Sequence, residues 1–173
     1  MSIEKYVKAA IKGDDKAFSY LMEINKESLY RTAFAYVKNK EDALDILQET
    51  VYKAYISIDK LKEPKYFNTW ITRILINNAI NLIRKNGKVI LLVDNMKEND
   101  EFVSDSNSDT KLDLLNAIDG LDDRYKNVII LKYFKDLTIN EIAEVLDCPV
   151  GTVKTHLNKG LSKLRVFLGE EII

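Results

Sequence analysis

TINEIAEVLDCPVGTVKTHLNKGLSKLRVFL, residues 138–168, is the stretch that decides the fold of the C-terminal part of the chain. Thr138 is followed three residues later by Glu141, which is the spacing of a capping box at the start of a helix. We predict this helix over 139–146, followed by a break at 147–149 and then a second helix. Two helices joined by a turn of about four residues are typical of a helix-turn-helix.

The second helix, expected over about 150–168, has an apolar side and a polar side. Val153, Leu157 and Leu164 share the inward side at helical spacing. The other side and its edges carry groups that suit base edges and phosphates in a DNA major groove. These candidate DNA contacts are Thr152, Lys154, Thr155, His156, Asn158, Lys159, Lys163 and Arg165. A solvated amphipathic helix is the alternative, but residues 148–169 contain no acid, which favours DNA binding.

A second candidate surface lies on a helix expected over 67–86 and ending near Gly87. Phe67, Ile71 and Leu75 belong to its broad apolar side. Arginine and asparagine side chains align on another side, where they could follow the phosphates of one strand and bond displaced bases. This stripe contains Thr69, Arg73, Asn77 and Arg84, with Asn81 at its margin. The alternative is again a solvated face.

Helical apolar stripes also cover the rest of residues 1–88, with expected helices over 2–12, 15–37 and about 40–59. Asp14 and Asn39 are candidate caps for the second and third of these. Residues 24–26 suggest an irregular middle in the second helix. In the third, Tyr55 is expected to face the core with Ala43, Leu47, Val51, Ala54 and Ile58.

Charge divides the chain into three parts. Residues 1–88 hold 16 Lys and Arg against 11 Asp and Glu, whereas 89–110 hold 1 against 6 and 111–173 hold 9 against 10. The short apolar run 89–93 could form an extended segment, and the acidic residues after it lack any apolar period, as in a flexible linker. We therefore predict an all-α protein of two small helical domains, 1–88 and 111–173, joined by the acidic linker 89–110.

Four motifs together resemble extracytoplasmic-function (ECF) sigma factors of the sigma-70 family. Residues 42–51 (DALDILQETV) are similar to the signature of sigma domain 2, and 67–84 (FNTWITRILINNAINLIR) to its −10-reading helix. Residues 125–146 and 151–157 resemble domain 4. The motifs cover nearly the whole chain in the family's order, and the Lys-rich composition suggests a sigma-V-like member.

The resemblance implies an alternative sigma factor that binds core RNA polymerase and directs promoter-specific initiation. Domain 2 would bind the clamp helices of the β′ subunit through Asp45, Gln48 and Glu49. The −10 element would be opened and held by Arg73, Asn77, Asn81, Arg84 and Lys85. Domain 4 would read the −35 element and hold the tip of the β flap. The family also implies a membrane-anchored anti-sigma factor, which would hold the protein at the inner face of the membrane.

Three positions depart from the family's usual pattern. Asp147 stands where glycine is common, His156 replaces a common arginine, and Gly160 replaces a common alanine. The aspartate and the glycine are expected to cost local stability, by about 1 kcal/mol for the glycine unless close packing compensates. His156 weakens any phosphate contact at neutral pH.

Other classes of protein are less consistent with the chain. A two-component regulator would share the helix-turn-helix but needs alternating strands and helices in its N-terminal part, and a plain interaction module would need no basic face. An enzyme is disfavoured because the chain has no Gly-rich phosphate loop, no metal-ligand cluster and a single histidine, so we expect no cofactor and no metal. One cysteine, no signal peptide and no apolar run near ~18 residues predict a cytoplasmic protein without membrane insertion.

Overall fold

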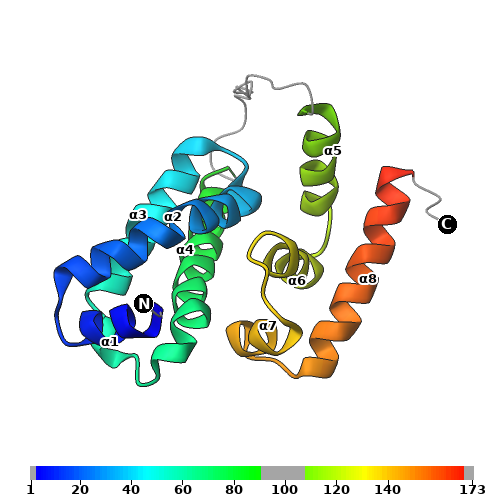
Figure 1. Cartoon of the computed structure of the whole chain (residues 1–173). Helices are drawn as coiled ribbons and strands as arrows, with labels where there is room; N and C mark the ends of the chain where they lie inside the picture. Colours follow the sequence, from blue (N-terminus) through cyan, green and yellow to red (C-terminus); the bar gives the residue numbers. More distant parts are fainter. Residues whose placement is uncertain (1–2, 91–107, 170–173) are drawn as a thin grey trace. The chain divides into compact units, whose positions relative to one another are not determined.

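Helices contain most of the residues that the computed structural model describes, which are 3–90 and 108–169. No strand occurs in those ranges, so the all-α prediction is confirmed. The chain divides into two units, Met1–Leu91 and Leu92–Ile173, and each builds its own core (Figure 1).

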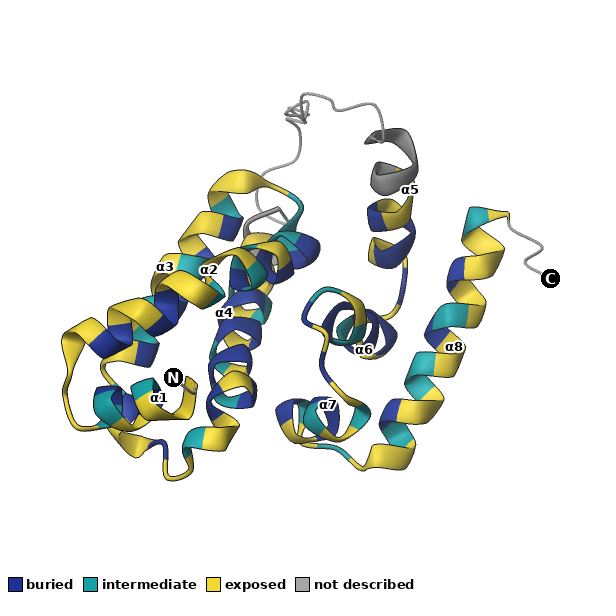
Figure 2. Ribbon diagram, viewed as in Figure 1, coloured by how far each residue is buried: buried dark blue, intermediate teal, exposed yellow. Residues whose placement is uncertain are grey.

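Four α-helices form the first unit. They are α1 (Ile3–Ile11), α2 (Asp15–Val37), α3 (Lys40–Tyr55) and α4 (Phe67–Ile90), with the short 3-10 helices η1 (Ile58–Lys60) and η2 (Pro64–Tyr66) before α4. Helices α2, α3 and α4 pack against one another, and α1 packs against α2. Figure 2 shows their buried faces turned toward a shared interior, which includes Leu21, Leu29, Ile46, Ile71 and Leu75.

Side-chain caps start two of these helices where the sequence predicts them. The carboxylate of Asp14 accepts hydrogen bonds from the backbone N–H groups of Lys16 and Ala17, each at 3.0 Å. The amide oxygen of Asn39 accepts one from the N–H of Asp42 at 2.7 Å. These three bonds satisfy donors that lack partners inside the helix.

Three local predictions for the first unit are wrong. Helix α2 is continuous through 24–26, where Asn25 donates its side-chain amide to the carbonyl of Leu21 at 2.8 Å. Tyr55 is 51% exposed instead of buried, and its hydroxyl bonds the carboxylate of Asp15 at 2.9 Å. Helix α4 continues past Gly87 to Ile90, because one glycine weakens a helix by about 1 kcal/mol without ending it.

The second unit contains the predicted helix-turn-helix. Its helices are α5 (Ser108–Asp119), α6 (Asp123–Tyr133), α7 (Ile139–Leu146) and α8 (Val150–Leu168), and α8 packs against the other three. The capping box of α7 is present: Thr138 N–H donates to the Glu141 carboxylate at 2.7 Å, and Glu141 N–H donates to the Thr138 hydroxyl at 3.3 Å. The core includes Val128, Ile129 and Ile142.

Helices occupy both ends of the segment 89–110. Helix α4 covers residues 89–90, so the extended segment expected at 89–93 is wrong there, and α5 begins at Ser108. The acidic stretch 91–107 lies outside the described residues, and its role as a linker stays a prediction.

Candidate nucleic-acid interface

The turn between α7 and α8 sets the position of the candidate recognition helix. Asp147 adopts the left-handed conformation (φ 51°, ψ 51°), and the N–H of Cys148 donates to the carbonyl of Ala143 at 3.1 Å. Pro149 is the N-cap residue that precedes α8, where its missing N–H removes no bond within the helix. Cys148 is half-buried, and burial, followed by the nearby Asp147 charge, raises the pKa of its thiol.

Most of the residues predicted to contact DNA on α8 are exposed together. Thr152 and His156 are half-buried, and the exposed ones are Lys154, Thr155, Asn158, Lys159, Lys163 and Arg165. Val153 and Leu164 are buried on the opposite side, as expected, and Leu157 is half-buried. The hydroxyl of Thr155 donates to the Gly151 carbonyl at 3.0 Å, which leaves its oxygen as an acceptor.

The Tyr125 ring of α6 contacts one imidazole and two basic groups beside α8. The Tyr125 ring is 6% exposed and meets the His156 ring edge-on, with centroids 5.5 Å apart and planes at 88°. The Lys163 ammonium lies 5.6 Å from its centroid and the Arg124 guanidinium 4.9 Å. Cation–π attraction of this kind is worth about 0.5–1 kcal/mol at exposed sites. The sequence reasoning missed both Tyr125 and Arg124, because they lie outside the helix-turn-helix.

Gly160 lets α8 approach α6 closely. A Cβ at this position would lie 3.1 Å from Cγ1 of Ile129 and 3.4 Å from Cβ of Tyr125. Any larger side chain would therefore displace α8 or its neighbours. This close packing is what compensates for the cost of placing a glycine inside a helix.

The candidate −10 residues form an exposed surface on α4. They are Arg73, Asn77, Asn81, Arg84 and Lys85. Thr69, placed on the same stripe by the sequence, is instead buried, and its hydroxyl donates to the Tyr66 carbonyl at 2.9 Å. A threonine in the first turn of a helix readily makes such a local bond, which turns its hydroxyl away from solvent.

The candidate polymerase contacts lie on α3. Asp45, Gln48 and Glu49 are all exposed, while Ile46 and Thr50 point into the core. Glu49 also pairs with Lys53 of the same helix at 3.1 Å.

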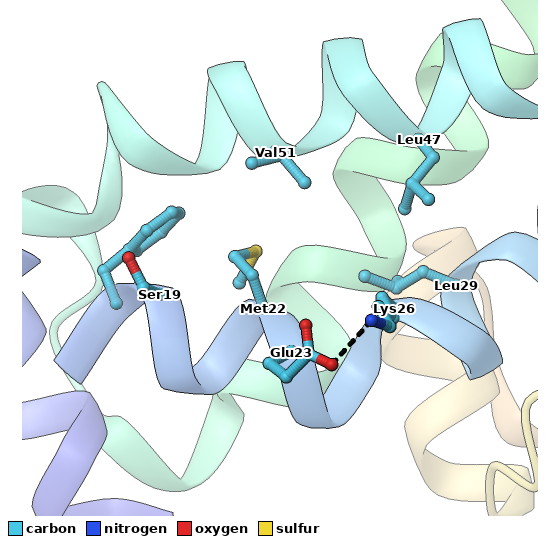
Figure 3. Close-up of a pocket in the computed structure, with 8 residues that line it drawn as sticks. Ser19, Met22, Glu23, Lys26, Leu29, Leu47 and Val51 are labelled. Atoms are coloured by element: carbon cyan, nitrogen blue, oxygen red, sulfur yellow. Dashed lines mark hydrogen bonds and ion pairs between the residues drawn. The ribbon is translucent and has the colours of Figure 1, made fainter. Parts of the chain in front are cut away.

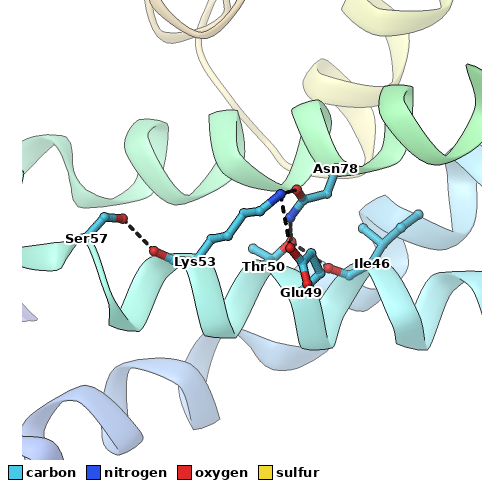
Figure 4. A network of polar contacts seen from close by, with 6 residues as sticks. All are labelled: Ile46, Glu49, Thr50, Lys53, Ser57 and Asn78. Atoms are coloured by element: carbon cyan, nitrogen blue, oxygen red, sulfur yellow. Dashed lines mark hydrogen bonds and ion pairs between the residues drawn. The ribbon is translucent and has the colours of Figure 1, made fainter.

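Figure 4 shows that Lys53 and Thr50 join α3 to α4 through Asn78. The Lys53 ammonium donates to the Asn78 side-chain oxygen at 2.6 Å, and the Asn78 amide donates to the Thr50 hydroxyl at 3.1 Å. Asn78 is 6% exposed and Thr50 is fully buried. The sequence predicts neither Asn78 nor Thr50 as part of a site, because the four-residue spacing of Glu49 and Lys53 indicates only their own ion pair within α3.

An apolar cavity of about 260 Å³ lies between α2 and α3 (Figure 3). Phe18, Met22, Leu29, Leu47 and Val51 line it together with Ser19 and the Glu23–Lys26 ion pair. It contains none of the candidate DNA or polymerase contacts.

Residues 3–90 and 108–169 contain no group of three or more His, Cys, Asp or Glu side chains that could hold a metal ion. Over the same ranges, no helix combines the length and the apolar content that a membrane span requires.

Comparison with known proteins places the chain in one family. The model of sigma-70 region 2 matches residues 21–89, and that of sigma-70 region 4 matches residues 111–164. The RNA polymerase sigma factor SigV of Bacillus subtilis (strain 168) is 41% identical over 149 residues, which are 85% of this chain and 88% of SigV. The ECF RNA polymerase sigma factor SigW of the same strain is 35% identical, over 95% of this chain and 96% of SigW.

Solved structures show the same fold. CnrH in complex with the cytosolic domain of CnrY matches with a TM-score of 0.77 and 21% identity, over 98% of each chain. The sigma factor RpoE in complex with the anti-sigma factor NepR from Bartonella quintana matches with a TM-score of 0.78 and 21% identity, over 91% of this chain and 99% of RpoE. On the two region models and the two Bacillus relatives, the chain belongs to the sigma-70 family of RNA polymerase sigma factors, in its ECF group.

Proposed function

We propose that this sigma factor directs core RNA polymerase to specific promoters by reading two elements with two surfaces. Helix α8 enters the major groove at the −35 element, and α4 holds the non-template strand of the −10 element. The observation that carries the proposal is the polar, acid-free face of α8 inside a helix-turn-helix of the sigma-70 region 4 family. Like other sigma factors, the protein acts as a non-catalytic initiation subunit.

The two surfaces differ in the chemistry of their contacts. The N-terminal residues Thr152, Lys154 and Thr155 of α8 meet base edges, as the N-terminal residues of recognition helices do. Lys159, Lys163 and Arg165 lie further along and contribute phosphate contacts. On α4, two asparagine amides lie between cations, which suits a single strand with unpaired bases. Extruding a base costs a few kcal/mol, which these contacts offset.

The proposed partners are inferred from the exposed side chains of α3 and from the proteins to which the chain is similar. Asp45, Gln48 and Glu49 contact the clamp helices of the polymerase β′ subunit, and domain 4 contacts the β flap. Two structures of similar fold are complexes, one with the cytosolic domain of CnrY and one with the anti-sigma factor NepR. By analogy, an anti-sigma factor binds this chain, and membrane anchoring of that factor holds the otherwise cytoplasmic protein at the inner face of the membrane.

Run-off transcription with bacterial core polymerase tests the proposal. A library of promoter fragments should give discrete start sites only when the sigma factor is added, and these sites define the −35 and −10 sequences. If the protein neither co-purifies with core polymerase nor supports initiation, the sigma function is refuted.

Lys159→Ala tests the phosphate contact of α8. Promoter binding by the holoenzyme should weaken, and the slope of log K against log salt should fall by about 1, because one fewer phosphate is neutralised. Lys8→Ala, an exposed lysine of α1, is the matched control and should leave the slope unchanged. An unchanged slope in Lys159→Ala would remove this assignment.

Asn77→Ala tests the single-strand contact of α4. Promoter opening, measured by permanganate reactivity of unpaired thymines, should fall more than holoenzyme assembly or closed-complex binding. Asn68→Ala is the control, because Asn68 is exposed on the same helix but about 180° around it from Asn77. Equal loss of assembly and opening would indicate misfolding or a docking role.

A further inference from the structure

Helix α4 has apolar side chains around much of its circumference. Ile71, Leu75, Ile76 and Ala79 are buried, whereas Ile83 is 40% exposed. Ile74, Ile80 and Leu82 are half-buried. A helix with one narrow apolar stripe buries that stripe at only one rotation about its own axis. If α4 were rotated about its axis by one residue, a different isoleucine would be buried in place of the present one. Apolar burial therefore specifies the rotation of α4 weakly.

The polar contacts of Asn78 strongly specify the rotation of α4. Its side-chain oxygen accepts from Lys53 at 2.6 Å, and its amide donates to Thr50 at 3.1 Å. The Thr50 hydroxyl in turn donates to the carbonyl of Ile46 at 2.7 Å, so each of these buried groups has a partner (Figure 4). Any other rotation of α4 would leave buried polar groups unpaired, which is costly at low dielectric.

The rotation of α4 decides which side chains reach solvent. Asn77 precedes Asn78 directly, and successive residues of a helix point 100° apart. With Asn78 held against α3, Asn77 is exposed, and so are Arg73 and Asn81 one turn to either side.

We propose that Asn78 is a positioning residue for promoter opening. Its bonds to Thr50 and Lys53 set the rotation of α4 on α3, and thereby present Arg73, Asn77 and Asn81 to the −10 strand. This inference rests on the proposed function of α4. Lys53 also pairs with Glu49, so one ammonium group joins the candidate polymerase-contact face to the strand-contact helix.

Asn78→Leu in the holoenzyme provides the test. Leucine has the branched shape of asparagine, although it is larger, and after the change Thr50 keeps its bond to Ile46 and Lys53 its pair with Glu49. Because neither group is left without a partner, the unit should keep most of its stability, measured as the midpoint of thermal unfolding by Trp70 fluorescence. Core binding should also stay at the wild-type value. Promoter opening, again by permanganate reactivity, should fall on the order of tenfold, since misplacing reacting groups by about 1 Å can reduce rates a hundredfold.

Thr50→Val provides a second variant, because it removes the same bond from the α3 side. It should reduce opening in the same direction, and the double variant should lose less than the product of the two single losses, as expected for groups in direct contact. Wild-type opening in both single variants would overturn the inference. So would a parallel loss of stability, core binding and opening in both variants, which would indicate a purely structural role.

Asn77→Ala separates this inference from the proposed function. If Asn77→Ala impairs opening and Asn78→Leu does not, only the positioning role fails. If Asn77→Ala leaves opening unchanged, the strand contact by α4 itself fails.

Discussion

Replacing Gly160 with alanine should destabilise the second unit, although alanine is the better helix former. Gly160 lies in the interior of α8 and is buried against α6. The new methyl group would lie 3.1 Å from Cγ1 and 3.4 Å from Cδ1 of Ile129. Ordinary carbon contacts lie at about 3.5–4.0 Å, so α8 and Ile129 must separate by roughly 0.4 Å.

The magnitude follows from two opposing contributions. Glycine to alanine in a helix interior stabilises by about 1 kcal/mol. Overpacking a core typically costs about 1–3 kcal/mol. Ile129 cannot relieve the contact easily, because it is only 2% exposed and a β-branched side chain in a helix has one strongly preferred rotamer. The free energy of unfolding should therefore fall by about 1 kcal/mol, which lowers the melting temperature of a small domain by roughly 4–8 °C.

Thermal unfolding of the full chain by circular dichroism measures this change. Trp70, the only tryptophan, belongs to the first unit, so its fluorescence transition should stay in place while the transition of the second unit moves. Gly151→Ala is the matched control on the same helix, since a Cβ there would meet nothing within 4 Å. That variant should be neutral or more stable by up to about 1 kcal/mol.

The packing argument would be refuted if Gly160→Ala were as stable as Gly151→Ala or more so. In that case the space between α8 and α6 would be larger than the contact distances indicate. A shift of the Trp70 transition would instead mean that the variant perturbs the first unit.

Three further predictions concern the second unit. Asp147→Gly should raise the free energy of unfolding by about 0.5–1 kcal/mol, because glycine removes the left-handed strain, and urea unfolding would detect it. Thr138→Ala should lower it by about 1 kcal/mol through loss of the capping box, and Glu141→Gln, which can still cap, should lower it less. Burial lowers the pKa of Lys135, against a smaller raising effect of Asp136, so the unfolded state binds more protons between the lowered value and the ordinary 10.5. Stability should therefore rise with pH across that window, and Lys135→Met should abolish the rise in unfolding curves taken at several pH values.

Local chemistry allowed the helix starts and caps to be predicted. The hydrogen bonds of Asp14, Asn39 and Thr138 reach only two or three residues along the chain, so the local sequence is enough to predict them. The exposed polar faces of α4 and α8 follow from helical period for the same reason. Gly87 misled the prediction because helix propensity is a weak preference that the surrounding residues override.

Some of the wrong and missed assignments involve partners far along the chain or a choice between two sides of a helix. Tyr55 is exposed because its hydroxyl reaches Asp15, forty residues away. Apolar periodicity identifies a core face only where the opposite side is polar, and α3 carries the exposed aromatic residues Tyr52 and Tyr55 outside its buried face.

The sequence by itself determined the helices, the helix-turn-helix and the family, because each of these is encoded by near neighbours or by motifs. Only the tertiary structure decided that the close contact with Ile129 of another helix requires a glycine at position 160. It also decided that Asn78 is buried against Thr50, twenty-eight residues away. The reason is physical: burial and hydrogen bonding between helices depend on how each helix is rotated against its neighbour, and a periodic pattern with apolar residues on several sides is compatible with more than one rotation.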